Sequence, residues 1–245
     1  MNTSLTIQPL GGEHTDETTR YLEASPIQTV YMRGLIREHG LEDVRNRGQF
    51  YACRAHDGQM RGVALAGDAI LFVADDEAAI ETLAVFSRDK FSPRLIRGER
   101  GPVEQFWRTY AGRCAPSHTF TEEHLLVMRE PPNAQDSDDA PALRPADYKD
   151  LPLLVEVNAA MLGTEGGRNP LESDPEGFCR RLARRVEAGR VLVWREGEHL
   201  AFKADIITDT PQAVYVEGVH VAPEWRGRGV GLQCLSRLGR LLLRR

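Results

Sequence analysis

Two periodic patterns of apolar and polar residues occur along this chain. In short stretches apolar and polar residues alternate, which predicts strands, and in longer ones apolar residues recur every three or four positions, which predicts helices. In the first half this pattern predicts strands at 4–9, 49–55, 61–66, 69–74, 94–97 and 123–129. It predicts helices within 15–39, at 75–90 and at 101–112. Ser25-Pro26 divides the first helical stretch, because proline disfavours helix in the residue before it.

Neither pattern is present at 131–142, PPNAQDSDDAPA. This stretch is rich in Pro, Asp and Ala and predicts a flexible linker. We therefore expect two domains, 1–130 and 143–245. The pattern of the second predicts strands at 143–145, 191–195, 200–207 and from 214, and helices at 146–162 and 175–188, with a loop at 163–174. Asp174 is expected to cap the second helix, with Pro175 at its first position. Short turns between the last three strands predict an antiparallel meander.

The stretch that carries candidate chemistry runs from Ala213 to Arg245. An alternating strand, Val214–Val221, leads into Arg226-Gly227-Arg228-Gly229-Val230-Gly231, and a helix with regularly spaced leucines follows. We call residues 226–231 the glycine loop. Glycines let successive backbone N–H groups converge, and the helix N-terminus adds partial positive charge. Together these features predict a cradle for a phosphate or pyrophosphate.

Several folds use such a cradle, and the surrounding residues distinguish them. A Walker loop requires Gly-Lys-Ser/Thr, and the glycine loop contains no lysine. A dinucleotide-binding fingerprint requires a parallel strand–helix–strand unit and an acidic residue about 20 positions on, which the chain does not supply. A simple glycine-rich linker is the remaining alternative, and the strand before the loop and the helix after it argue against it.

The spacing Val221-x-Pro223-x-x-Arg226-Gly227-x-Gly229-x-Gly231 resembles the acetyl-CoA signature of the GNAT N-acetyltransferases. The resemblance covers roughly residues 142–245 and implies an α/β (α+β) fold, in which a mixed, mostly antiparallel sheet is flanked by helices. Residues 4–130 show a similar order of elements, but Asp75-Asp76-Glu77 stands where a phosphate loop would lie and would repel a pyrophosphate. The whole chain therefore resembles bacterial tandem GNAT proteins with a degenerate N-terminal domain.

The resemblance also implies that the second domain lacks its last elements. A GNAT domain normally continues past this helix with a strand, a helix and a final hairpin, which form the far wall of the acetyl-CoA cleft. We therefore expect Val214–Val221 to present a free edge and the last helix to carry poorly covered leucines. Both features favour self-association or a completing partner chain.

By the same resemblance, the activity is direct attack of an amine on acetyl-CoA, with a small-molecule or peptide amine as acceptor. The implied cosubstrate-binding residues are Val219, His220, Val221, Arg226, Gly227, Arg228, Gly229, Val230 and Gly231. The first three act through their backbone, and the others form the pyrophosphate loop. Two alternatives stay open: a non-catalytic CoA-binding or interaction module, and a mycothiol-synthase-like tandem acetyltransferase.

Glu217 is the first candidate for the catalytic base. It lies on the strand before the glycine loop, and strand spacing places it on one face with Tyr215 and Val219. Tyr215 is the second candidate, because the position that is most often acidic in the family aligns nearer to it. His220 has a suitable intrinsic pKa but is expected on the opposite face. Lys203 and Asp205, on the neighbouring strand, are further candidates.

Composition narrows the class of protein without identifying the acceptor. The net charge is −5 over 245 residues, which argues against general nucleic-acid binding. The four cysteines are widely spaced and form no CxxC pair, so no metal site is expected. There is no stretch of about 20 apolar residues and no signal-peptide pattern, so we expect a cytoplasmic protein without a membrane span.

Overall fold

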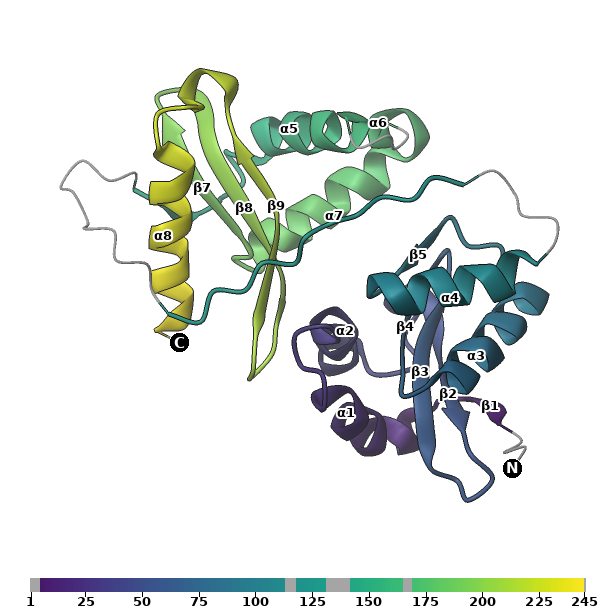
Figure 1. Cartoon of the computed structure of the whole chain (residues 1–245). Coiled ribbons are helices and arrows are strands. Elements are labelled where there is room, and N and C mark those ends of the chain that lie inside the picture. Colours follow the sequence, from purple (N-terminus) through teal and green to yellow (C-terminus); the bar gives the residue numbers. More distant parts are fainter. Residues whose placement is uncertain (1–4, 113–117, 131–141, 165–168, 245) are drawn as a thin grey trace. The chain divides into compact units, whose positions relative to one another are not determined.

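The computed structural model describes residues 5–112, 118–130, 142–164 and 169–244 (Figure 1). The chain divides into two compact units. The first comprises 1–124 with 210–213, and the second comprises 125–209 with 214–245. The predicted linker, 131–142, lies outside the described residues except for its last position.

The first unit contains a five-stranded sheet whose strands lie in chain order. These strands are β1 (Thr6–Pro9), β2 (Gly48–Arg54), β3 (Met60–Gly67), β4 (Ala69–Ala74) and β5 (Leu95–Arg97). The first four pair antiparallel, whereas β5 is parallel to β4. The helices are α1 (Thr15–Glu23), α2 (Val30–His39), α3 (Glu77–Lys90) and α4 (Arg100–Ala111). Residues of α1 and α2 pack on one apolar cluster, and those of α3 and α4 pack on another.

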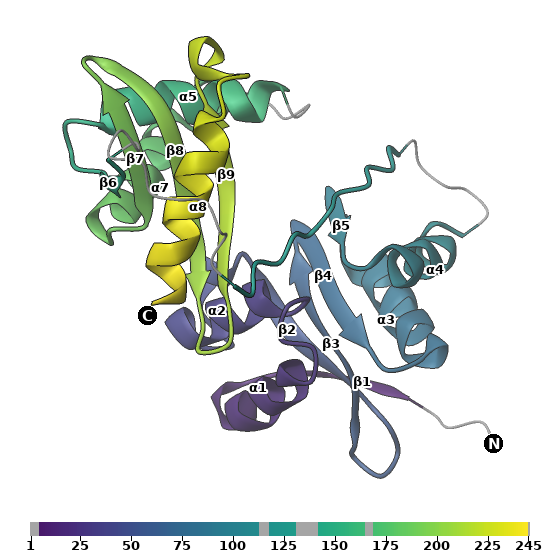
Figure 2. The same cartoon turned by 60° about the vertical axis from the view of Figure 1, so that its left-hand side comes forward.

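The second unit contains a four-stranded antiparallel sheet in the order β6-β7-β8-β9. Its strands are β6 (Arg144–Pro145), β7 (Val191–Glu196), β8 (His199–Asp209) and β9 (Val214–Val221). Its helices are α5 (Leu151–Thr164), α6 (Pro170–Ser173), α7 (Pro175–Glu187) and α8 (Val230–Leu243). Figures 1 and 2 both show α8 running along the sheet, and its residues share an apolar cluster with β7, β8 and β9. Residues of α5 and α7 form a separate cluster with β7 and Leu200.

Local hydrogen bonds from side chains explain where α5, α6 and α7 begin. The Asp174 side chain accepts the Gly177 N–H at 2.9 Å, and Pro175 occupies the first turn of α7, as predicted. The helix predicted from 146 begins only at Leu151, because Asp150 accepts the Asp147 N–H and holds the preceding residues in a turn. The short helix α6 was not predicted. Asn169 caps it through the Leu171 N–H.

The strand predicted at 123–129 is absent: residues 118–129 form neither helix nor strand. Leu125, Leu126, Val127 and Met128 are all exposed. Alternating hydrophobicity produces a strand only where a neighbour supplies the backbone hydrogen bonds, and no described strand pairs with this segment.

Among the described residues β9 is an outer strand of its sheet and pairs only with β8. On α8, Leu238 is buried, whereas Leu232, Leu241 and Leu243 are exposed. None of the helices in the described ranges is long and apolar enough to cross a membrane.

Candidate functional site

The glycine loop has the backbone conformation that its glycines allow. After β9, a short 3-10 helix, η3 (Pro223–Trp225), leads to Gly227 and Gly229, which have φ values of +72° and +78°. Residues with a Cβ adopt this left-handed region only rarely. A Cβ at either position would meet no described atom within 4 Å, so the loop backbone faces open space. The glycines therefore shape a turn whose outer side a ligand can approach.

The N-terminus of α8 opens at this turn. Gly229 is its N-cap and offers no side chain to accept a backbone N–H. The first intrahelical bond runs from the Gln233 N–H to the Gly229 carbonyl at 3.1 Å. The N–H groups of Val230, Gly231 and Leu232 precede that bond and so have no partner within the helix. With the helix dipole, these donors can bind an anion.

Contacts behind the loop fix it on the sheet. Arg226 Nε donates to the Val221 carbonyl at 2.8 Å, which ties the loop to the end of β9. The Trp225 ring packs edge-to-face on Trp194 of β7, with centroids 4.9 Å apart. The guanidinium of Arg228, an exposed residue, lies 5.7 Å from the centre of the Trp225 ring. The loop thus has a rigid support and a cation on its exposed side.

The pairing of β9 with β8 changes register just before the loop. Glu217 pairs with Asp205 and His220 pairs with Lys203, so Gly218 and Val219 both lie opposite Ala204. Gly218 has φ +61°, and this extra residue is a β-bulge. The bulge inverts the alternation of the side chains beyond it.

This bulge corrects the expected position of His220. Lys203 and Asp205 are two residues apart on β8 and therefore share a face. Their partners His220 and Glu217 must lie on that same face, not on opposite faces as the uninterrupted alternation predicted. Tyr215 still shares this face with Glu217, but the alternation no longer extends to Val219.

Behind the bulge lies a cluster of charged side chains that the sequence placed only among the further candidates. Lys203 is 0% exposed and Asp205 is 2% exposed. Lys203 Nζ donates to Asp205 Oδ2 at 2.9 Å and to Asn158 Oδ1 of α5 at 2.7 Å. Arg185 of α7 donates to the same Asp205 oxygen at 3.0 Å. Burial lowers the pKa of Lys203, an effect that the Asp205 charge opposes.

Sequence reasoning gave no role to Asn158 or Arg185, since each is polar on an otherwise ordinary amphipathic helix. One signal was present. In the stretch LAFKADII at 200–207, a lysine and an aspartate two positions apart interrupt an otherwise apolar strand. Charges in such a strand are buried on one face of the sheet, where they require partners.

His220 is partly buried on the face that Lys203 and Asp205 occupy. Burial lowers the pKa of His220, as do the nearby charges of Arg226 and Lys203, while Glu224 acts in the opposite direction. The lowered pKa favours the neutral imidazole, the form that can accept a proton.

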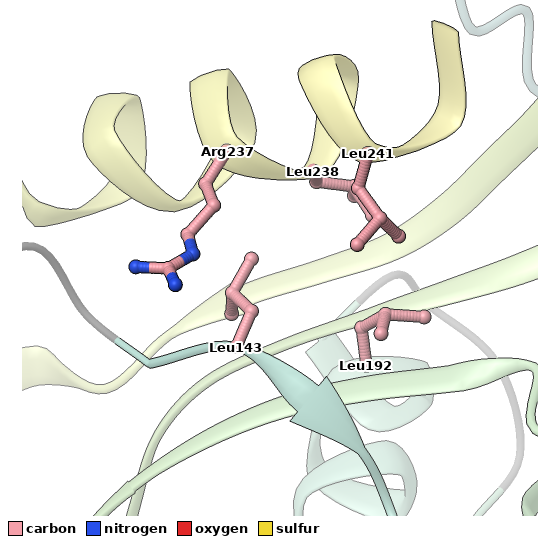
Figure 3. A pocket seen from close by; sticks show the side chains of 5 residues that line it. All are labelled: Leu143, Leu192, Arg237, Leu238 and Leu241. Atoms are coloured by element: carbon pink, nitrogen blue, oxygen red, sulfur yellow. The ribbon is translucent and has the colours of Figure 1, made fainter. Parts of the chain in front are cut away.

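A small apolar pocket elsewhere in this unit is distinct from the glycine loop. Leu238 and Leu241 of α8 face Leu192 of β7 and Leu143, with the Arg237 guanidinium to one side (Figure 3). Leu238 lies seven residues beyond Gly231, about 10 Å along the helix at 1.5 Å per residue. The pocket therefore does not form part of the candidate site.

Comparison with known proteins identifies the fold. No family model and no curated protein matches the sequence. The structure of a GNAT-family acetyltransferase from Colwellia psychrerythraea is similar, with a TM-score of 0.54 and 12% sequence identity. The match covers 97% of this chain and 87% of the Colwellia chain. A GCN5-related N-acetyltransferase from Sphaerobacter thermophilus is also similar, with a TM-score of 0.55 and 13% sequence identity. That match covers 98% of this chain and 83% of the Sphaerobacter chain. The chain has the GNAT fold. The α/β fold class expected from the sequence is thereby confirmed.

Two further structures match. A Drosophila protein covers 98% of this chain and 86% of its own, with a TM-score of 0.59 and 12% identity. An acetyltransferase from Clostridium acetobutylicum, solved with acetyl-CoA, covers 41% of this chain and 71% of its own at 24% identity. Its TM-score is 0.34.

Proposed function

We propose that this chain is an acyl-CoA-dependent N-acyltransferase, which moves an acetyl group from acetyl-CoA to an amine. The observation that carries the proposal is the uncapped N-terminus of α8, which follows an outer strand and a glycine loop in a GNAT fold. In this proposal the backbone of Arg226–Gly231 holds the pyrophosphate, and the Arg228 side chain adds positive charge beside it.

The outer edge of β9 supports the rest of the binding proposal. Among the described residues β9 pairs with β8 alone, so in this proposal the backbone N–H and C=O groups that point to its other side bind a ligand. An extended chain with amide groups, such as the pantetheine arm of CoA, can add to such an edge as a strand does. We assign this contact to the backbone of Val219, His220 and Val221.

Acetyl-CoA would supply an acyl group activated as a thioester. For transfer, the acceptor nitrogen bonds to the acyl carbon, the carbon–sulfur bond breaks with its electron pair leaving on the CoA sulfur as a thiolate, and the nitrogen gives up a proton to the protein. We assign that proton to Glu217, an exposed carboxylate two residues from Tyr215 and three from His220. Tyr215 is the second candidate for this role. A positioned base of this kind contributes roughly 10²–10⁴-fold to a rate.

Calorimetry with acetyl-CoA, followed by a thiol-release assay over a panel of primary amines, tests this function. We expect saturable binding with one acetyl-CoA per chain and thiol release with at least one amine. Binding without thiol release would instead support the non-catalytic CoA-binding module. Absence of binding at millimolar acetyl-CoA would show that the glycine loop is not a phosphate site.

We also propose that the exposed leucines of α8, away from the strand segment assigned to the pantetheine arm, form an interface with a second copy of this chain. Leu232 and Leu241 are 68% and 44% exposed. Sedimentation equilibrium should give a mass above that of one chain, and Leu232→Glu should lower it. A monomeric wild-type chain would contradict the interface.

A further inference from the structure

The buried ion pair Lys203–Asp205 is not explained by stability. Removing two charges from water is costly, and apolar replacements of such pairs are often neutral or stabilising. One oxygen of the pair, Asp205 Oδ1, is buried without a hydrogen-bond partner among the described residues, which adds a further cost. Buried polar groups that do not stabilise a fold are candidates for a functional role.

The pair lies directly behind the bulge of β9. A Cβ at Gly218 would come within 3.0 Å of Asp205 Oδ2 and 3.2 Å of Lys203 Nζ. The same two side chains reach Asn158 on α5 and Arg185 on α7. The pair therefore links both covering helices to the bulge at Gly218, which is one of the two places where the pairing of β8 with β9 shifts register.

We propose that the Lys203–Asp205 pair is a positioning device for acetyl transfer, which holds the bulge at Gly218 and thereby presents His220 beside Glu217 on one face of β9. The inference rests on the proposed function for its catalytic consequence. Its geometric part stands on the strand register and the contacts of Gly218. Without the bulge, alternation would return His220 to the opposite face of the sheet.

Several charged groups surround His220, and their sources differ. Lys203 and Asp205 project from β8, Arg226 and Glu224 come from the segment after β9, and Glu217 lies on β9 itself. Arg185 reaches the cluster from α7 through Asp205. Lys203 and Arg226 lower the pKa of His220, while Glu224 raises it. Removing the Lys203 cation should therefore raise the pH at which His220 titrates.

The first experiment replaces the pair by apolar residues of similar size, Lys203→Met with Asp205→Leu. We expect an unchanged or higher melting temperature, and acetyl-CoA binding that is weakened only through the pantetheine contact at Val219–Val221, because the glycine loop is untouched. We expect kcat to fall at least tenfold, and in Lys203→Met alone, which keeps the Asp205 carboxylate, we expect the NMR titration midpoint of His220 to rise. A purely structural pair would lower the melting temperature and leave kcat of the folded fraction unchanged.

The second experiment tests the contact with Gly218 by a double-mutant cycle. Gly218→Ala should lower the melting temperature through both the contact with Asp205 and the strain of its φ. In the background of Asp205→Ala the contact disappears, so the same change should cost less. Gly197→Ala is the matched control, because Gly197 has φ +57° with no atom within 4 Å of a Cβ. It should show no coupling to Asp205.

Three results would overturn the inference. The first is a wild-type kcat in the apolar double variant together with an unshifted His220 midpoint in Lys203→Met, provided that the wild-type chain turns over. The second is additivity of Gly218→Ala and Asp205→Ala. The third is a wild-type chain that neither binds acetyl-CoA nor releases thiol, which would overturn the proposed function and with it the catalytic part of the inference. The His220 midpoint and the cycle need no turnover, so these failures are distinguishable.

Discussion

In each unit a strand is followed by a helix, and the segments that connect strand and helix differ between the two units. In the first unit, β4 leads into α3 through Asp75-Asp76. In the second, β9 leads into α8 through the glycine loop. Both helix N-termini offer backbone N–H donors and partial positive charge. The two turns differ in what can accept hydrogen bonds from these N–H donors.

In the first unit a carboxylate of the protein accepts a hydrogen bond from these donors. Asp76 Oδ1 accepts the Ala79 N–H at 2.9 Å, and its other oxygen pairs with Arg61. The Ala79 N–H and the Arg61 guanidinium lower the pKa of Asp76. The acidic run predicted to repel a pyrophosphate thus supplies an anion of its own at this helix terminus. In the second unit Gly229 supplies none, and the donors stay open to an external anion.

The strands that precede the two turns, β4 and β9, also differ in their pairing and in the polarity of their side chains. The pairing of β3 with β4 runs from Gly62 to Ala66 without a register shift, and β5 covers the other side of β4. β4 has the apolar sequence AILFVA, whereas β9 contains Tyr215, Glu217 and His220 and is bulged at Gly218. The β9–α8 turn thus combines an open helix terminus, an outer strand and polar side chains, whereas at the β4–α3 turn the helix terminus is capped and β4 is an apolar strand paired on both sides.

Gly229→Asp should have the largest effect, because it gives the second turn the carboxylate that the first turn has. We expect acetyl-CoA affinity to fall at least about 100-fold through charge repulsion and occupation of the helix donors. Calorimetry measures this, and circular dichroism checks the fold. Gly197→Asp is the control for the strain of a residue with positive φ and should bind normally. Unchanged affinity in a folded Gly229→Asp protein would refute the phosphate-loop assignment.

Glu217→Gln should lower kcat by roughly 10²-fold at neutral pH, since β9 loses the proton acceptor that β4 never had. The dissociation constant for acetyl-CoA should change little, because the loop is intact. Steady-state kinetics over a pH series, with Tyr215→Phe as the parallel variant, would separate the two candidates. If only Tyr215→Phe alters the pH–rate profile, the role belongs to Tyr215.

Asp76→Ala should destabilise the first unit by about 1 kcal/mol, because it removes the cap of α3. The pKa of Asp76 is lowered in the folded state from an ordinary value of 3.8, so its contribution is present above about pH 4 and disappears as the pH falls through the lower folded value. Urea unfolding at neutral and acid pH measures the difference. Asp76→Asn, which keeps a capping oxygen, should retain most of the stability, and an Asp76→Ala protein as stable as wild type would disprove the cap.

Arg228→Gln should have the smallest effect, about two- to fivefold weaker acetyl-CoA binding, since an exposed cation contributes little to affinity. The difference from wild type should shrink as salt rises, because ions screen exposed charges. Calorimetry at two ionic strengths tests both points. Equal affinities at low salt would show that the Arg228 side chain contributes only through its packing on Trp225.

Much of the fold was predictable because it depends on neighbours in sequence. Alternation located β2, β3, β4, β7 and β8, and the predicted break near Ser25-Pro26 falls between α1 and α2. The cap by Asp174 and the positive φ of Gly229 follow from local stereochemistry. The strand expected at 123–129 failed because a strand needs a partner, and sequence periodicity does not report whether one is present.

The sequence by itself determined the two-part order of elements and the glycine loop, because capping, periodicity and glycine conformation act within a few residues. Only the tertiary structure decided which face of β9 holds His220, because a one-residue bulge inverts alternation. It also decided the surroundings of Lys203, whose partner Asn158 lies 45 residues away on α5. Burying a charge requires partners that the chain can supply only after the sheet and its covering helices have assembled.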